Sequence, residues 1–123
     1  MDKSELIQMV AASMGALGVA AGAFGAHALR SRLEASGRVG TWDTAVRYHL
    51  IHALALMLVA FSIQLPGSIV NMTTLASVSF TVGIVLFSGS LYGLALGGPR
   101  WLGPVTPLGG VALIAGWLFL GLC

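Results

Sequence analysis

The chain carries very little charge. Lys and Arg together number six and Asp and Glu four, so that 8% of the 123 residues are charged. A water-soluble domain has about 25% charged residues. Because 57% of the residues are hydrophobic and the mean hydropathy is +0.93, a hydrated surface cannot cover this chain, and lipid is predicted to surround most of it. The small net charge of +2 disfavours a nucleic-acid-binding surface.

The motifs of common enzyme classes are also absent. The sequence has no H-E-x-x-H zinc helix, no Walker loop, no dinucleotide fingerprint and no nucleophile elbow. Its four carboxylate residues, Asp2, Glu5, Glu34 and Asp43, lie away from the middle of every apolar stretch, which disfavours an ion-coupled pump. The single cysteine, Cys123, excludes an intramolecular disulfide. We therefore expect a protein that is not an enzyme and that holds no metal or cofactor.

Four apolar stretches predict membrane-spanning helices. They cover approximately residues 6–26, 45–65, 74–96 and 102–122. Each has roughly 20 residues, which at 1.5 Å per residue crosses a hydrocarbon core of about 30 Å. Backbone groups in lipid must be hydrogen-bonded within their own segment, so spans of this length are helices. The expected fold is all-α: residues 1–123 form one integral membrane domain, a bundle of four transmembrane helices.

The first connection is predicted to contain a short helix. In HALRSRLEASGR, Leu29 and Leu33 fall on one side of a helix and charged residues surround the rest. This pattern is typical of a helix lying in the membrane interface. Gly37 is expected to end it.

Positive charge gathers in the first and third connections, which lie on the same side of a four-span protein. They contain Arg30, Arg32, Arg38 and Arg100, whereas the opposite side has only Lys3. The positive-inside rule therefore predicts that the arginine-rich loops are cytoplasmic and that both termini are outside, in a bacterial-type inner membrane. Trp42 and Trp101 lie beside these loops, where an interfacial aromatic belt is expected.

Glycines recur at helical spacing in three of the four spans. The three sets are Gly15, Gly18, Gly22 and Gly25; Gly89, Gly93 and Gly97; and Gly109 and Gly116. In lipid, helices associate by close backbone approach and not by the hydrophobic effect, and glycine permits that approach. These glycines are predicted to line helix–helix contacts.

Polar side chains gather by sequence at the arginine-rich end of the second span. The set is His27, Asp43, Arg47, Tyr48, His49 and His52. Asp43 and Arg47 are four residues apart, so an ion pair is expected. Tyr48, His49 and His52 can share one helical face, and His27 ends the first span on the same side of the membrane.

Four interpretations of this polar cluster remain open. The favoured one is interfacial anchoring combined with hydrogen bonds between helices. The second is a quinone, proton or small-ligand site, in which a histidine works with a tyrosine and a carboxylate. A metal site would use the three imidazoles, which suit zinc, copper and iron. A haem site would need two histidines that face each other between helices.

Four blocks of the sequence resemble the YgdD/YwdK-like family of small inner-membrane proteins, which is catalogued as a domain of unknown function. The blocks are GALGVAAGAFGAHAL, TWDTAVRYHLIHALALML, FSGSLYGLALGG and LGPVTPLGGVALIAGW. The resemblance implies a four-helix integral membrane protein. It supplies no catalytic or binding residues, although its last two blocks contain Ser88, Ser90, Tyr92, Thr106 and Trp117.

The favoured functional hypothesis is a non-enzymatic membrane component that acts by helix packing, either as an accessory or assembly subunit of a larger complex or as a homo-oligomer in the lipid bilayer. Its alternative is an oligomeric channel or carrier for a small neutral or weakly charged solute. A third class is redox, in which the histidines hold haem or approach a quinone.

Overall fold

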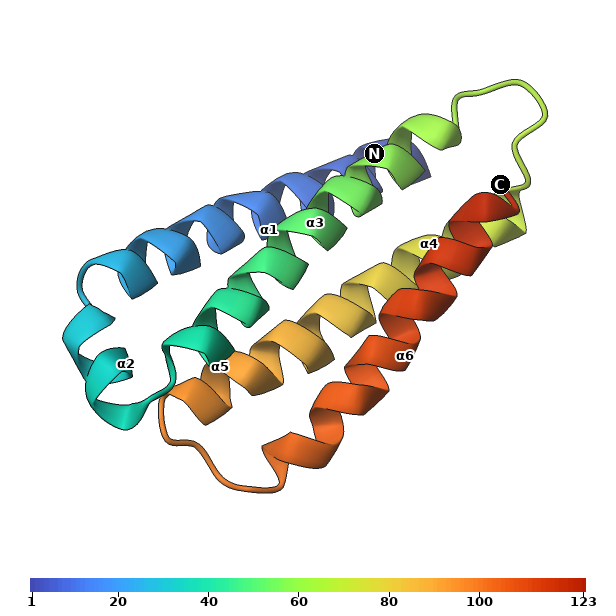
Figure 1. The fold of residues 1–123 in the computed structure, drawn as a ribbon. Helices are drawn as coiled ribbons and strands as arrows, with labels where there is room; N and C mark the ends of the chain where they lie inside the picture. The colour runs from blue at the N-terminus through green and yellow to red at the C-terminus, as the bar shows by residue number, and fades with distance from the viewer.

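The computed structural model describes residues 1–123 and is helical throughout (Figure 1). In chain order the elements are α1 (Lys3–Ala26), α2 (Arg30–Ser36), α3 (Val39–Ser62), α4 (Val70–Gly83), η1 (Ile84–Ser88), α5 (Gly89–Ala95) and α6 (Leu102–Gly121). The elements α4, η1 and α5 follow one another without a break and form one rod, Val70–Ala95. The predicted all-α fold is confirmed.

Four helical segments are long and apolar enough to cross a membrane. They are α1, α3, the rod Val70–Ala95 and α6, with 24, 24, 26 and 20 residues. The second of these begins at Val39, six residues before the start that hydropathy indicates. The reason is that the polar residues in TWDT still form helical turns, so the helix continues beyond the apolar stretch.

The short helix α2 is present in the first connection, and Gly37 ends it. Gly37 has a φ of 70°, a left-handed conformation, and its N–H bonds to the carbonyls of Leu33 and Glu34. Glycine reaches this conformation without the steric cost of a side chain. The chain turns here, and Gly40 is already part of α3.

The helices are arranged as an open series and not as a closed ring. Helix α1 packs against α3, α3 packs against the rod Val70–Ala95, and α4 packs against α6. Figure 1 shows α1 beside α3 and α4 beside α6. The outer helices α1 and α6 are each 17% buried over their most apolar segment, compared with 44% for α3. A large part of α1 and of α6 therefore faces lipid.

The interior is small and lies along α3 and α4. Phe80, Leu56 and Val59 are fully buried in the main apolar cluster. A second cluster, around Leu33 and Trp42, fixes α2 to the arginine-rich end of the bundle. Trp42 is 6% exposed and does not face lipid as an interfacial belt would require. Its indole N–H donates to the Ala21 carbonyl of α1 at 2.9 Å.

Glycines of two helices allow the closest helix approaches. On α1, a side chain at Gly18, Gly22 or Gly25 would meet Leu50, Val46 or Trp42 of α3. On α6, a side chain at Gly109 would meet the backbone of Phe87, and one at Gly116 would meet Phe80. At these five positions the glycine lies in a helix–helix contact, as the glycine spacing predicts.

Three predicted packing glycines have a different environment. Nothing lies within 4 Å of the position that a Cβ would occupy at Gly15, Gly89 or Gly97. Gly97 has a φ of 87° and serves the turn after α5. Gly93 meets Leu102 across that turn. Gly15 borders a gap between α1 and α3 that Leu50 and Met57 also line. The spacing pattern does not show how closely the helices meet at each turn.

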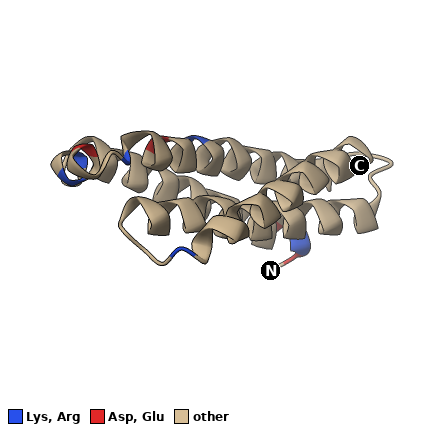
Figure 2. Ribbon diagram, turned by 60° about the horizontal axis from the view of Figure 1, so that its bottom comes forward, with Lys and Arg blue, Asp and Glu red and all other residues tan.

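The two ends of the bundle differ in charge. Figure 2 shows basic and acidic residues around α2 and the adjoining part of α3, long uncharged stretches along the helices, and a basic residue near the N-terminus. That residue is Lys3, whose ammonium donates to the Val70 carbonyl at 2.9 Å and to the Thr73 hydroxyl at 3.0 Å. Lys3 thus connects the start of α1 to the start of α4 by hydrogen bonds, a role that the composition does not predict.

Candidate functional site

His49 and His52 point to different partners. The Nδ1 atom of His49 is hydrogen-bonded to the Tyr92 hydroxyl of α5 at 2.8 Å. The other ring nitrogen of His49, Nε2, is buried and has no hydrogen-bond partner. His49 therefore joins α3 to α5, whereas His52 lies one turn further along α3 and is oriented toward α6.

Both ring nitrogens of His52 are occupied by hydrogen bonds. Nδ1–H donates to the Tyr48 carbonyl at 2.6 Å, and Nε2 accepts from the indole N–H of Trp117 on α6 at 3.0 Å. A carbonyl only accepts and an indole N–H only donates, so the ring is neutral with its proton on Nδ1. A metal or haem iron bound at Nε2 would have to displace Trp117. This geometry favours a structural role for His52.

The expected cluster of histidines does not form. His27 is exposed at the end of α1, beside Ala20 and Phe24. No three His, Cys, Asp or Glu side chains come together in the chain. The spacing in the sequence places His27 at the correct end of the membrane, but it does not predict the direction of the side chain around the helix.

The expected ion pair between Asp43 and Arg47 is also absent. The chain has one ion pair, between Arg30 and Glu34 of α2 at 3.1 Å. Asp43 and Arg47 are both exposed on α3. Spacing by four residues permits an ion pair, but the long side chain of an exposed arginine loses conformational entropy in forming one, and water weakens the attraction. Arg47 is left without a partner in the chain.

Two further hydroxyl contacts connect the helices near this region, and a third is local. The buried Ser88 hydroxyl of η1 donates to the Ala45 carbonyl of α3 at 2.7 Å. The hydroxyls of Ser90 and Thr106 lie 2.5 Å apart and join α5 to α6. The Ser90 hydroxyl also donates to the Phe87 carbonyl, one turn earlier, at 2.9 Å. Such contacts are the usual role of Ser and Thr in membrane helices.

A groove lies between α3 and α6, with η1 as its floor. It has a volume of about 560 Å³. The residues that line it include Arg47, Tyr48, His52, Phe87, Gly110 and Trp117. We call it the α3–α6 groove. The aromatic rings of Tyr48 and Phe87 lie 4.6 Å apart between their centroids, so the groove has an aromatic wall with one cationic side chain.

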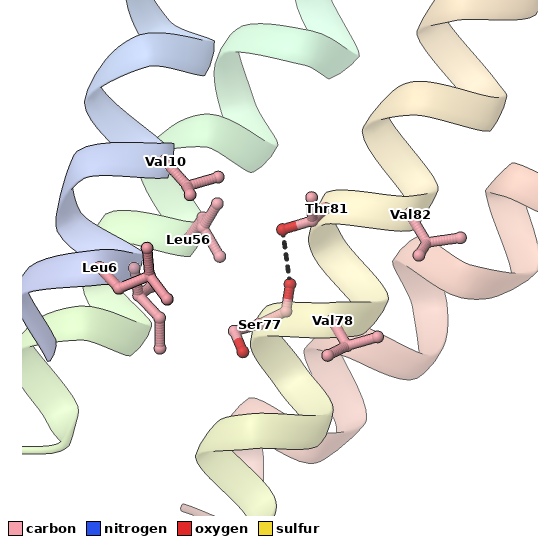
Figure 3. A pocket seen from close by; sticks show the side chains of 8 residues that line it. Leu6, Val10, Leu56, Ser77, Val78, Thr81 and Val82 are labelled. Carbon is pink, nitrogen blue, oxygen red and sulfur yellow. Dashed lines mark hydrogen bonds between the residues drawn. The ribbon is translucent and has the colours of Figure 1, made fainter. Parts of the chain in front are cut away.

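A smaller cleft separates α1 from α4 (Figure 3). It has a volume of about 250 Å³, and mainly apolar side chains such as Leu6, Val10 and Val78 line it. Figure 3 shows the Thr81 hydroxyl bonded to the carbonyl of Ser77 on the same helix. Since its polar groups are bonded within α4, this cleft has no arrangement for chemistry. It marks the open side of the helix series.

Sequence reasoning missed Trp117 as the partner of His52. Trp117 is 65 residues away in the chain, and no local spacing relates the two. The available signal was weak: an indole N–H inside an apolar span needs an acceptor. His52 lies about 20 Å and Trp117 about 22 Å from the arginine-rich ends of their helices, counted at 1.5 Å per residue. That agreement in depth is the only feature of the sequence that pairs them.

Comparisons with known proteins agree with this architecture. The model of the family described as "Protein of unknown function (DUF423)" matches residues 21–110. The chain is 45% identical over 104 residues to the UPF0382 membrane protein YwdK of Bacillus subtilis, covering 85% of this chain and 83% of YwdK. It is 41% identical over 117 residues to the UPF0382 inner membrane protein YgdD of Escherichia coli, covering 95% of this chain and 87% of YgdD.

No solved structure matches the chain. The family match covers the polar residues of α3, the η1 turn and the first half of α6. The four membrane-length helices and the two bacterial relatives together confirm the family resemblance and establish a membrane protein. The chain belongs to the DUF423 family, whose relatives carry the name UPF0382 membrane proteins.

Proposed function

We propose that this chain is a non-catalytic membrane component that acts by associating with another membrane-embedded chain through the lipid-facing side of α1. The proposed partner is a second copy or a subunit of a larger complex. One observation supports this function: the outer helix α1 exposes four alanines on one side, so its lipid-facing surface includes small residues that permit close approach of another helix.

The lipid-facing side of α1 contains alanines at helical spacing, beside larger exposed side chains such as Leu17 and Val19. Ala12, Ala16, Ala20 and Ala23 are exposed on one side of the helix, and we call them the α1 alanine face. Gly15 borders it, and nothing lies within 4 Å of its Cβ position. Small residues let a second helix approach the backbone closely, which is the main source of attraction between helices in lipid.

The other outer helix exposes no comparable set of alanines. Helix α6 exposes Leu108, Val111, Ile114 and Leu118 to the lipid. Large branched side chains cover its backbone and keep a neighbouring helix at a distance. The proposal therefore assigns the association to α1, and it expects α6 to contact lipid chains.

The polar groups of the spans support a structural role. The His49–Tyr92, His52–Trp117 and Ser90–Thr106 contacts each join two helices of the same chain. These contacts fix the helices relative to each other. Solute transport, the second candidate, would therefore need a path between associated copies, so it depends on the same association.

The arginine-rich end is proposed to be cytoplasmic, with both termini outside. The support is the distribution of basic residues: Arg32 and Arg38 lie at the α2 end, and Lys3 lies at the opposite end (Figure 2). The Lys3 ammonium is already bonded to α4.

The proposal is tested by energy transfer between two populations of labelled chain in vesicles of increasing lipid content. The parent chain is expected to associate. Gly15→Leu and Ala16→Leu are expected to weaken the association, because they add bulk at the α1 alanine face. A leucine at Gly15 also enters the gap toward α3 that Leu50 and Met57 line, so Ala16→Leu is the cleaner of the two variants. Gly121→Leu is the matched control, since its Cβ position is also free of neighbours within 4 Å, at the far end of α6.

Two results would contradict the proposal. One is a parent chain that stays monomeric in vesicles and also purifies without any other subunit. The other is an association that Gly15→Leu and Gly121→Leu weaken equally. Measured solute flux that requires the associated state would favour the channel or carrier as its function.

A further inference from the structure

Arg47 is an unpaired cation within a membrane helix. Arg30 forms an ion pair with Glu34, and Arg32 donates to the Leu96 carbonyl at 2.8 Å. Arg47 has no such partner, and its neighbour Asp43 does not form an ion pair with it. Charged side chains within membrane segments are costly and normally find a counter-charge. Arg47 is therefore free to bind an anionic group from outside the chain.

Arg47 lies at one end of the α3–α6 groove, toward the arginine-rich side of the protein. It is eight residues from the start of α3, which places it about 12 Å from that helix end at 1.5 Å per residue. Trp117 lies fifteen residues into α6, at about 22 Å. The groove therefore starts within reach of the headgroup region and continues toward the middle of the bilayer.

The lining of the groove changes from cationic to apolar along its length. Arg47 and Tyr48 lie at the shallow end, and Ile114 and Trp117 lie at the deep end. Ile114 and Trp117 are exposed, so the groove opens to the lipid and not to the interior of the bundle. An occupant must have a negative head and an apolar tail.

We propose that the α3–α6 groove binds an anionic phospholipid of the leaflet on the arginine-rich side, with its phosphate at Arg47 and one acyl chain along Phe87 and Trp117. The guanidinium can bond two phosphate oxygens at once. Tyr48 also lines the groove, and its hydroxyl can donate a further hydrogen bond. A basic pocket between membrane helices is the kind of site that selects anionic lipid headgroups.

Gly110 makes room for the acyl chain. A Cβ at Gly110 would lie 3.7 Å from the Phe87 ring, an ordinary contact distance. A side chain at Gly110 thus projects into the groove without disturbing the fit of α6 on η1. Substitution there changes the occupancy of the groove and not the fold.

The proposal is tested by quenching of Trp117 fluorescence with lipids whose acyl chains carry bromine. Trp117 is 44% exposed in the groove. Trp101 is 66% exposed and Trp42 is 6% exposed, so a Trp101→Phe background makes Trp117 the main reporter. Vesicles contain phosphatidylcholine and phosphatidylglycerol in a fixed ratio, with bromine on one lipid or on the other.

We expect brominated phosphatidylglycerol to occupy the groove about fivefold more readily than brominated phosphatidylcholine, the preference that one Arg near an anionic headgroup supplies. Arg47→Gln is expected to reduce this preference to near one. Gly110→Leu is expected to lower quenching by both lipids. Arg100→Gln, which removes an exposed cation from the connection at the same end, is expected to leave the preference unchanged.

Equal quenching by the two lipids would overturn the proposal. A loss of preference that is the same in Arg47→Gln and Arg100→Gln would also overturn it, because general surface charge would then explain the effect. The groove lies on α3 and α6, away from the α1 alanine face. A monomeric chain can therefore show the lipid preference, and an associating chain can lack it.

Discussion

A pair of adjacent glycines on α6 gives a sharp test of the packing. A Cβ at Gly109 would lie 2.7 Å from the Phe87 Cα and 2.8 Å from the Leu86 carbonyl carbon, whereas the closest contact of a Cβ at Gly110 is 3.7 Å. Backbone atoms of η1 cannot rotate away as a side chain can. The Phe87 nitrogen lies closer still to that Cβ position. Gly109→Ala must therefore push α6 away from η1 by more than about 0.7 Å, the shift that would restore 3.4 Å at the Phe87 Cα alone.

The two substitutions are expected to change stability in opposite directions. Overpacking of this kind costs about 1–3 kcal/mol, and replacing a helical glycine by alanine returns about 0.5–1 kcal/mol. The expected net loss of stability for Gly109→Ala is on the order of 1 kcal/mol. Gly110→Ala keeps the helix-propensity gain without the clash, so its expected change is a small increase.

The two variants are compared by thermal unfolding in one detergent. The readout is the fraction of the chain that stays monodisperse on a sizing column after heating. Gly109→Ala is expected to lower the melting temperature and Gly110→Ala to keep or raise it. A Gly109→Ala variant as stable as Gly110→Ala would refute the close approach of α6 to η1.

Three further predictions concern hydrogen bonds and topology. Trp117→Phe leaves His52 Nε2 without its donor, so the free energy of unfolding is expected to fall by about 1 kcal/mol in the same assay; unchanged stability would mean that this hydrogen bond is not formed. Ser88→Ala removes the bond to the Ala45 carbonyl and is expected to cost about 0.6 kcal/mol, and a stabilised variant would contradict this contact. Partial burial raises the pKa of the Cys123 thiol, so less thiolate is present at neutral pH and maleimide labelling should accelerate as the pH rises. An impermeant maleimide is expected to label Cys123 on intact cells, whereas labelling only after lysis would reverse the proposed orientation.

The overall architecture follows from the sequence because hydropathy and length are strong constraints in a bilayer. Twenty apolar residues have to be helical in lipid, so the membrane helices are readable without structural information. The stop at Gly37 is also readable, because only glycine takes the left-handed conformation easily. The start of α3 at Val39 cannot be predicted in this way, since hydropathy does not detect polar residues that continue a helix into the membrane interface.

Which residues face which helix is not readable from spacing alone. Gly15 continues the three- and four-residue pattern of its neighbours on α1, yet its Cβ position has nothing within 4 Å. His49 and His52 are close in sequence but join α3 to different helices. The π-helical turn η1 is likewise not predicted by the spacing of residues in the sequence.

The measurement that bears most directly on association through α1 is native mass spectrometry of the tagged chain, released gently from its own membrane. We expect a defined homo-oligomer or a stable complex with another membrane subunit, and we expect Ala16→Leu to shift that species toward the single chain. A parent chain that is released only as a monomer, with no partner of any kind, would contradict the proposed function.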